Sequence, residues 1–311
     1  MSRILTLALF LILTYSVNSQ DIKQNPNLGN PKDIKHNPDL IAKGAKVMKI
    51  AGNYAFTEGP SVAPDGRVFF TDQPNDKILI WNEKGNAITT FLESSERSNG
   101  TYFNKKGELV ACADLHNRLV VFGMDGKQRI IAENYNGQPL NAPNDLWIAP
   151  NGGIYFSDPY YARDYWEPDH KEMQDKRGVY YLNPNGKVTR VIDDYKQPNG
   201  LIGTPDGKTL YVSDINSRKI WRYTINADGS FSNKTFFAPE GSDGMTIDNK
   251  GNVYLTNRFV SVFDKTGKSI AHIEVPEMPA NICFGGKKRN ILFITARTSV
   301  YTLKMKVKGV N

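Results

Sequence analysis

The chain has 311 residues, of which 40% are hydrophobic and 11% aromatic, and its formal net charge is +7. Length alone suggests about two domains, but single all-β domains often reach this size, and no linker rich in Pro or Ser divides the sequence. The basic residues form no Lys/Arg cluster interleaved with aromatic residues, which argues against a nucleic-acid-binding protein.

The first element predicted from the sequence is a signal peptide at residues 1–19. Arg3 provides a charged start, Ile4–Leu13 an apolar run, and Val17–Ser19 a cleavage position. The run is too short for a membrane span, and no cysteine follows it for lipid attachment. We expect a periplasmic or secreted protein without a membrane anchor, whose formal charge becomes +6 once Arg3 is removed. Residues 20–44 are expected to form an extended leader before one domain at 45–311.

Six stretches of similar design then follow one another along the chain. Each begins with an oxygen-bearing side chain and reaches a turn residue eight positions later. The starting residues are Glu58, Asn99, Asn144, Asn199, Asp243 and Asn281. The turn residues are Gly66, Gly107, Gly152, Gly207 and Gly251, with Arg289 in the sixth unit.

After each turn comes a short run of β-branched and aromatic residues, which predicts a strand. These runs are Val68–Asp72, Leu109–Asp114, Ile154–Asp158, Leu210–Asp214, Val253–Asn257 and Ile291–Thr295. Further apolar runs follow, such as Ile78–Trp81 and Val179–Leu182. A unit of roughly 40–50 residues with about four strands is the size of a propeller blade. The sequence therefore predicts an all-β, six-bladed β-propeller.

The six starting side chains would face one another if the units surround an axis. Carboxylate and amide oxygens in such a ring suit a hard divalent cation. Asn-Gly and Asp-Gly pairs are also common turn formers, but Glu58 stands where no turn favours it, and Asp145 follows Asn144 in place of glycine. We therefore expect one central metal ion, Ca²⁺ in the first place, with Zn²⁺, Mg²⁺ or Mn²⁺ as alternatives.

An insertion in the third unit is predicted to lie over this ring. The longest interval between turn glycines, from Gly152 to Gly207, contains the segment from Pro159 to Arg177. Strand direction places this segment on the face of the ring, and its aromatic residues suit a lid or a substrate wall. The alternative is a surface loop that packs on its own aromatic side chains.

The two cysteines, Cys112 and Cys283, are expected to be buried free thiols. They fall in the second and sixth units, with the first unit between them, too far apart for a disulfide. Neither they nor the four histidines show the spacing of a zinc site.

Together and in order, these motifs resemble the SMP-30/gluconolactonase/LRE family over nearly all of residues 45–305, most closely its bacterial gluconolactonases. The segments are Thr57–Pro60, Arg97–Gly100, Ala142–Asp145, Phe156–Pro159, Gln197–Gly200, Leu210–Asp214, Ser242–Met245 and Pro279–Gly286. The resemblance implies a six-bladed propeller with one divalent metal ion held by Glu58, Asn199 and Asp243, with Asn144 as an additional ligand. Some animal members contact the sugar lactone with an arginine where this chain has Ala142, so that contact does not carry over.

The implied chemistry is metal-dependent hydrolysis of a sugar lactone. The metal would polarise the carbonyl, Asp243 is the candidate general base, and Glu58 acts as ligand and charge balance. The sequence contains no Gly-x-Ser-x-Gly elbow, which disfavours a serine esterase. A related metal-dependent esterase or phosphotriesterase and a non-catalytic ligand-binding propeller remain alternatives. The candidates for substrate binding are Asn99, Asn144, His116, Asp158, Tyr160, Tyr161 and Arg97.

Overall fold

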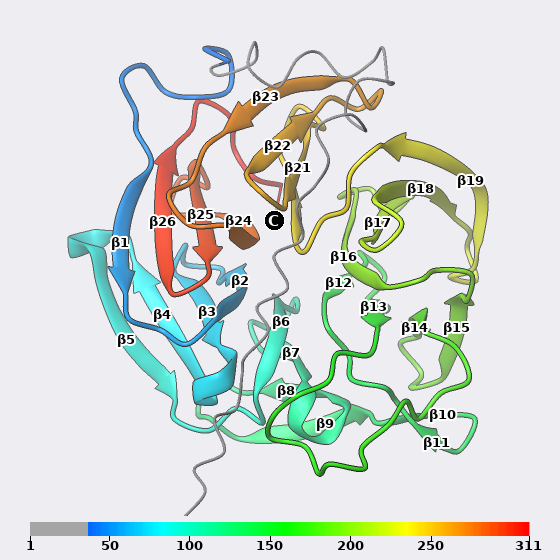
Figure 1. Ribbon diagram of the computed structural model, residues 1–311. Coiled ribbons are helices and arrows are strands. Elements are labelled where there is room, and N and C mark those ends of the chain that lie inside the picture. The colour runs from blue at the N-terminus through cyan, green and yellow to red at the C-terminus, as the bar shows by residue number, and fades with distance from the viewer. Residues whose placement is uncertain (1–36, 311) are drawn as a thin grey trace, which may run out of the picture.

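The computed structural model describes residues 37–310, and within them six four-stranded antiparallel sheets surround a central axis (Figure 1). The predicted signal peptide lies outside the described residues. Helical structure in the described part is limited to the short 3₁₀ turns η2 (Gln73–Asn75), η3 (Lys84–Asn86) and η4 (Asp114–His116). No helix there is long and apolar enough to cross a membrane. The prediction of an all-β six-bladed propeller is confirmed.

Blades 1 to 5 each run from an innermost to an outermost strand in chain order. Blades 1 to 3 are β2 (Thr57–Val62), β3 (Val68–Asp72), β4 (Lys77–Asn82) and β5 (Ala87–Leu92); β6 (Ser98–Phe103), β7 (Leu109–Ala113), β8 (Arg118–Phe122) and β9 (Gln128–Ala132); and β12 (Leu146–Ile148), β13 (Ile154–Asp158), β14 (Gly178–Leu182) and β15 (Val188–Ile192). Blades 4 and 5 are β16 (Pro198–Gly203), β17 (Thr209–Asp214), β18 (Lys219–Ile225) and β19 (Phe231–Ala238); and β20 (Met245–Ile247), β21 (Val253–Thr256), β22 (Val260–Phe263) and β23 (Ser269–Ile273). A small hairpin of β10 (Asn134–Tyr135) and β11 (Gln138–Pro139) stands apart from the blades.

Blade 6 closes the ring by joining the two ends of the domain. Its strands β24 (Pro279–Gly285), β25 (Ile291–Ala296) and β26 (Ser299–Lys304) come from the end of the chain, and β1 (Met48–Gly52) pairs antiparallel with β26. Ile41 also bridges to Met305, and Leu40 and Ile41 are buried. The packed domain therefore begins before the boundary predicted at residue 45.

The six repeated turns have the backbone conformation that their glycines permit. All five turn glycines have positive φ, from 71° at Gly207 to 96° at Gly66. Arg289 in the sixth turn also has a positive φ, 55°, and its N–H donates to the Gly286 carbonyl at 2.9 Å. A side chain rarely adopts this region at no cost, so the sixth turn carries strain that the others avoid.

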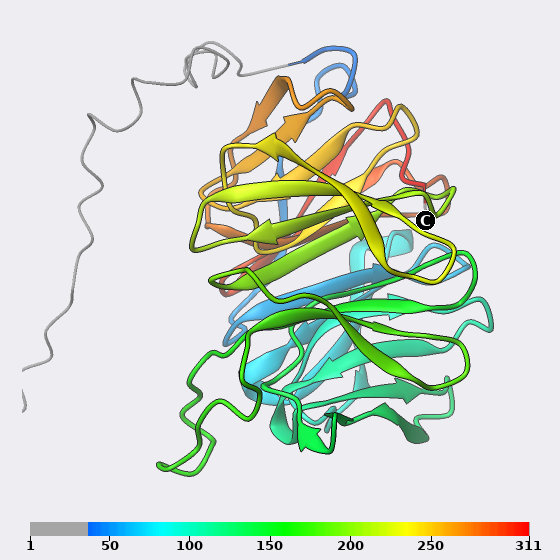
Figure 2. The same ribbon diagram turned by 90° about the vertical axis from the view of Figure 1, so that its right-hand side faces the viewer.

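Apolar side chains fill the space between blades. Strand β3 is buried along its whole length, and Phe293 of blade 6 packs against Phe70 and Trp81 of blade 1 with ring centroids 5.5 and 5.3 Å apart. Cys112 and Cys283 are both buried and free, as the sequence predicted. Figure 2 shows the blades edge-on, with the green segment that contains residues 159–177 protruding from one face.

Aspartates at the ends of three second strands hold the chain just before the ring residues. Each carboxylate accepts two backbone N–H groups, which come from positions three and two residues before the ring residue of its blade. Asp72 accepts from Ala55 and Phe56, Asp158 from Asn141 and Ala142, and Asp214 from Lys196 and Gln197, at 2.9–3.2 Å. These bonds fix how the backbone enters the channel and so place Glu58, Asn144 and Asn199.

We predict that Asp214→Ala lowers the free energy of unfolding by about 2–4 kcal/mol, because two backbone N–H groups lose their acceptor. Chemical denaturation measures this. The control is Asp194→Ala in the same region, where the exposed carboxylate pairs with Lys234 at 2.5 Å; we expect a loss under about 1 kcal/mol there. Equal losses in the two variants would show that Asp214 does not hold the backbone.

Candidate functional site

The six ring residues lie at the entrance of the innermost strands. Each innermost strand contacts those of both neighbouring blades, so the strands enclose a central channel. Glu58, Asn99, Asn199 and Asn281 lie within the first three residues of their strands, and Asn144 and Asp243 lie two residues before β12 and β20. Asp243 is partly buried and the other five are buried. The structure therefore brings all four predicted metal ligands to one end of the channel.

Two carboxylates in this ring oppose each other electrostatically. Burial raises the pKa of Glu58 well above its usual range, and the charge of Asp243 raises it further. The N–H of Gly59, which donates to Glu58 at 2.9 Å, acts in the opposite direction and lowers this pKa. Burial also raises the pKa of Asp243 to about 6, although the Asn199 amide and the charges of Arg163 and Arg297 favour the ionised form. A bound divalent cation would balance both negative charges.

Asn199 supplies an oxygen that the protein leaves unused. Its Nδ2 donates to Asp243 Oδ1 at 2.8 Å and to the Tyr161 hydroxyl at 2.9 Å, which fixes the orientation of the amide. Its Oδ1 is buried and has no hydrogen-bond partner within residues 37–310. A buried acceptor without a partner costs free energy, and a cation would remove that cost. The residues present therefore fit a metal ion.

The ligand set is rich in amides. No group of three His, Cys, Asp or Glu side chains converges within residues 37–310. Glu58 and Asp243 supply two charged ligands, and the asparagines supply neutral oxygens. Hard cations with flexible oxygen coordination, Ca²⁺ above all, accept such a set, whereas zinc sites in proteins are built mainly from His and Cys.

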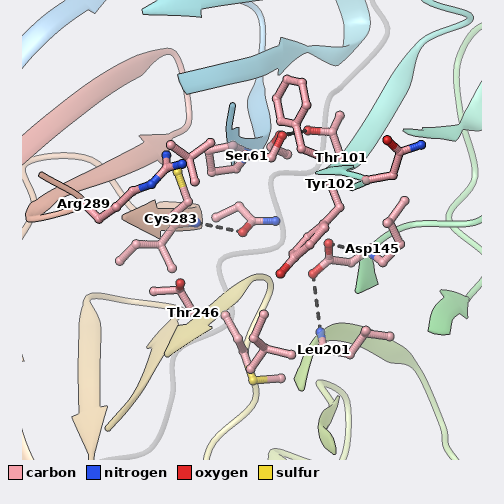
Figure 3. A pocket seen from close by; sticks show the side chains of 18 of the residues that line it. Ser61, Thr101, Tyr102, Asp145, Leu201, Thr246, Cys283 and Arg289 are labelled. Carbon is pink, nitrogen blue, oxygen red and sulfur yellow. Dashed lines mark hydrogen bonds between the residues drawn. The ribbon is translucent and has the colours of Figure 1, made fainter. Parts of the chain in front are cut away.

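The innermost strands also line a cavity of about 250 Å³ (Figure 3). Its lining includes Tyr102, Asp145 and Thr246 and reaches Arg289, in the turn at the opposite end of the blade 6 hairpin. Burial raises the pKa of Asp145 to about 7, and the N–H groups of Leu146 and Leu201 donate to its carboxylate at 2.9 and 3.4 Å. Asp145 is thus a third buried carboxylate beside the ring, held by backbone donors.

The residues predicted to bind substrate do not all lie in the ring. Asn99 and Asn144 are in the ring. The carboxylate of Asp158 accepts the backbone N–H groups of residues 141 and 142. The hydroxyl of Tyr160 donates to the carbonyl of His170 at 3.0 Å, and its ring stacks on the imidazole of the same residue. Both are therefore engaged within the protein, and their role toward a substrate stays a prediction.

Of the three remaining candidates, Tyr161 accepts a hydrogen bond from Asn199 of the ring at 2.9 Å, and Arg97 and His116 lie at the outer rim. Arg97 donates to the Pro74 carbonyl, and its guanidinium lies 4.2 Å from the centre of the Tyr165 ring, in the insertion. His116 is exposed at the end of η4. Neither contacts a ring residue directly in the described structure, so their roles also stay predictions.

Two functional candidates escaped the sequence analysis, Arg163 and Asp114. Arg163 comes from the insertion, and its Nη2 lies 2.6 Å from Asp114 Oδ2 at the end of β7. These two residues are 49 positions apart, and nothing in the sequence paired them.

The family model described as the SMP-30/Gluconolactonase/LRE-like region matches residues 56–298. The chain belongs to this family. The gluconolactonase of Zymomonas mobilis is 28% identical over 331 aligned residues, which cover 95% of this chain and 92% of that protein. A solved structure of a putative gluconolactonase is 31% identical, with a TM-score of 0.81 and coverage of 88% and 96%. That of XC5397 from Xanthomonas campestris, described as a gluconolactonase, is 27% identical, with a TM-score of 0.79 and coverage of 88% and 93%. The family predicted from the sequence is confirmed.

We predict that Glu58→Gln, Asn199→Ala and Asp243→Asn each weaken the binding of Ca²⁺ at least about tenfold, since each removes a ring oxygen or its charge. Isothermal titration calorimetry of protein stripped of metal measures the affinity. Asp206→Asn is the control, because Asp206 lies in the turn at the opposite end of the blade 4 hairpin, where it accepts the Lys208 N–H at 3.1 Å. Wild-type affinity in Asp243→Asn would refute its assignment as a ligand.

We further predict a dependence on pH with opposite signs for the metal-free and metal-loaded protein. The pKa of Asp243 rises from 3.8 to about 6 on folding, and that of Glu58 rises as well. The folded metal-free protein therefore holds protons that the unfolded chain has released, and these groups destabilise it as the pH rises from about 4 through 6. Metal affinity should increase over the same interval, because binding requires the ionised carboxylates.

Thermal unfolding and calorimetry between pH 4.5 and 7.5 test this pH dependence. Other groups also titrate, so the comparison is with the double variant Glu58→Gln/Asp243→Asn. Without metal, wild type should lose stability relative to the variant as the pH rises. A constant difference across the interval would mean that the two pKa values are not raised.

Proposed function

We propose that this protein is a metal-dependent lactonase that hydrolyses a sugar lactone to the corresponding aldonic acid, with Ca²⁺ as its ion. The observation that carries the metal site is the buried Oδ1 of Asn199, which has no hydrogen-bond partner among residues 37–310 and lies beside the carboxylates of Glu58 and Asp243. Membership of the family and the gluconolactonase and lactonase relatives, including the lactonase drp35 of Staphylococcus epidermidis, support an enzyme that acts on lactone esters.

The ring residues divide the chemical work. A divalent cation, when bound, supplies Lewis-acid polarisation of the lactone carbonyl and stabilises negative charge on its oxygen. Beside a bound cation Asp243 would be ionised, and its carboxylate would be able to take a proton from the attacking water. Water adds to the carbonyl carbon, the ring C–O bond breaks, and the proton passes from Asp243 to the departing oxygen.

The remaining ring residues hold Asp243 and balance charge. Asn199 donates to Asp243 Oδ1, which leaves the other carboxylate oxygen for the proton transfer. Glu58 is buried and tied to the N–H of Gly59, a position that suits a ligand better than a mobile base. Arg163 and Arg297 favour the ionised form of Asp243 and so prepare it to accept a proton.

We predict that the purified protein hydrolyses δ-gluconolactone, that EDTA removes the activity, and that Ca²⁺ restores it better than Zn²⁺, Mg²⁺ or Mn²⁺. A pH-indicator assay corrected for spontaneous hydrolysis measures the rate. p-Nitrophenyl acetate and an organophosphate triester are assayed beside it. Faster turnover of either would indicate an esterase or phosphotriesterase instead, and bound metal without any turnover would indicate a ligand-binding propeller.

We also propose that the protein is exported to the periplasm or beyond, on the evidence of the charged start, apolar run and small residues of segment 1–19. The mature chain is then expected to begin near Gln20. Mass spectrometry of the protein purified from its native cells measures the N-terminus, and a chain that still starts at Met1 or Ser2 would contradict export by this signal.

A further inference from the structure

The insertion 159–177 is tied to the metal ring through two of its side chains. The hydroxyl of Tyr161 accepts a hydrogen bond from Nδ2 of Asn199 at 2.9 Å. Two residues further on, Nε and Nη2 of Arg163 bind Asp114 Oδ2 at 2.8 and 2.6 Å, and the guanidinium lies 5.5 Å from the centre of the Tyr161 ring. Asp114, Arg163, Tyr161 and Asn199 thus form one connected series from blade 2, across the insertion, to blade 4.

Asp114 departs from the role that the corresponding aspartates perform in three other blades. Asp72, Asp158 and Asp214 each hold two backbone N–H groups ahead of a ring residue. In blade 2 that task falls partly to Asp76, whose Oδ1 accepts the Arg97 N–H at 2.5 Å. Asp114 is left free to bind the insertion, and its Oδ2 also accepts from Nε2 of Gln73 at 2.8 Å.

Burying the carboxylate of Asp114 costs more free energy than a purely structural contact is expected to return. The residue is 1% exposed, and its Oδ1 has no hydrogen-bond partner within the described residues 37–310. A buried ion pair seldom stabilises a fold, because desolvation offsets the attraction. An arrangement that holds a guanidinium at the mouth of the channel at this cost fits a role in binding better than a role in stability.

Tyr161 and Arg163 retain unused hydrogen-bond donors. Because Tyr161 accepts from Asn199, its hydroxyl proton is available for another acceptor. Arg163 uses Nε and Nη2 on Asp114, and its Nη1 makes no hydrogen bond within residues 37–310. Its side chain is 21% exposed and Tyr161 is partly buried, so both are within reach of a bound molecule. The charge of Arg163 is also felt at Asp243.

These donors match the oxygen atoms of a polyhydroxylated ring. We propose that Tyr161 and Arg163 form the subsite that binds the hydroxyl groups of the lactone, and that Asp114 is a positioning residue that holds Arg163 in place. This assignment rests on the proposed lactonase function.

The experiment compares two lactones that differ in their hydroxyl groups, δ-gluconolactone and δ-valerolactone, using the metal-loaded full-length mature protein. We expect Tyr161→Phe and Arg163→Met to lower kcat/KM for gluconolactone about tenfold or more, through a higher KM, and to change the value for valerolactone less than about threefold. Asp114→Asn should show the same selective rise in KM. Arg163→Lys, which keeps the charge, should recover part of the loss.

The matched control is Arg67→Met, in the turn before β3 at the opposite end of the blade 1 hairpin. Arg67 pairs with Asp65 at 2.7 Å and lies 5.6 Å from the centre of the Phe69 ring, so it makes the same kinds of contact as Arg163 without touching the insertion. We expect wild-type kinetics on both lactones. Ca²⁺ affinity and thermal unfolding are measured for every variant, to detect any indirect effect through Asn199.

The outcomes separate this proposal from the proposed function. If wild type hydrolyses neither lactone with any metal, the lactonase function itself fails. If wild type is active but the variants lose both substrates equally, the residues act on the fold or the chemical step, and the subsite assignment is wrong. Unchanged gluconolactone kinetics in Tyr161→Phe and Arg163→Met would overturn it as well.

Discussion

The rest of this structure depends on one constraint: two carboxylates, Glu58 and Asp243, are held close to each other in a buried channel. Glu58 and Asp243 raise each other's cost of ionisation, and burial adds to it. Left free to move, such groups would separate or become protonated. They stay together because the backbone that carries them is fixed, by buried innermost strands and by strand-end aspartates that hold the residues preceding the ring. The fold thus keeps the two carboxylates together despite their repulsion, and a bound cation would remove that repulsion.

That fixed arrangement requires a closed ring. The β1 strand from the start of the domain completes the blade built from its last strands, so one sheet holds both ends of the domain together. Packing of Phe293 against Phe70 and Trp81 then joins blade 6 to blade 1. This junction brings Glu58 of blade 1 and Asn281 of blade 6 into the same ring of six side chains.

The features that could be predicted from the sequence are the ones that repeat. A turn residue eight positions after each ring residue fixes the hairpin, and the predicted runs Val68–Asp72 and Ile154–Asp158 coincide with β3 and β13. The same spacing in all six units also predicted which side chains form the ring. The closing strand β1 could not be found in this way, because Met48–Gly52 carries no ring residue or turn of its own and is defined only by its partner β26.

The sequence also did not predict the partners of side chains at positions where one blade differs from the others. Asp158 and Asp114 follow their strands in the same manner, yet one accepts backbone N–H groups and the other binds Arg163. The difference arises from the neighbours: Asp76 holds the Arg97 N–H in blade 2, and the insertion brings a guanidinium that has no counterpart in the other blades. Local sequence contains no record of either contact.

This division has a chemical consequence. The ring oxygens come from repeated positions and suit a cation, whereas the donors beside them come from a single insertion that contributes no proposed ligand. The two parts meet at Asn199, whose Oδ1 has no hydrogen-bond partner among residues 37–310 and whose Nδ2 donates to Asp243 and Tyr161. Because that one amide donates to both Asp243 and Tyr161, the insertion and the ring are coupled. A change in the insertion that moves the Tyr161 hydroxyl would therefore also disturb the orientation of Asn199 and of the oxygen that it offers to a cation.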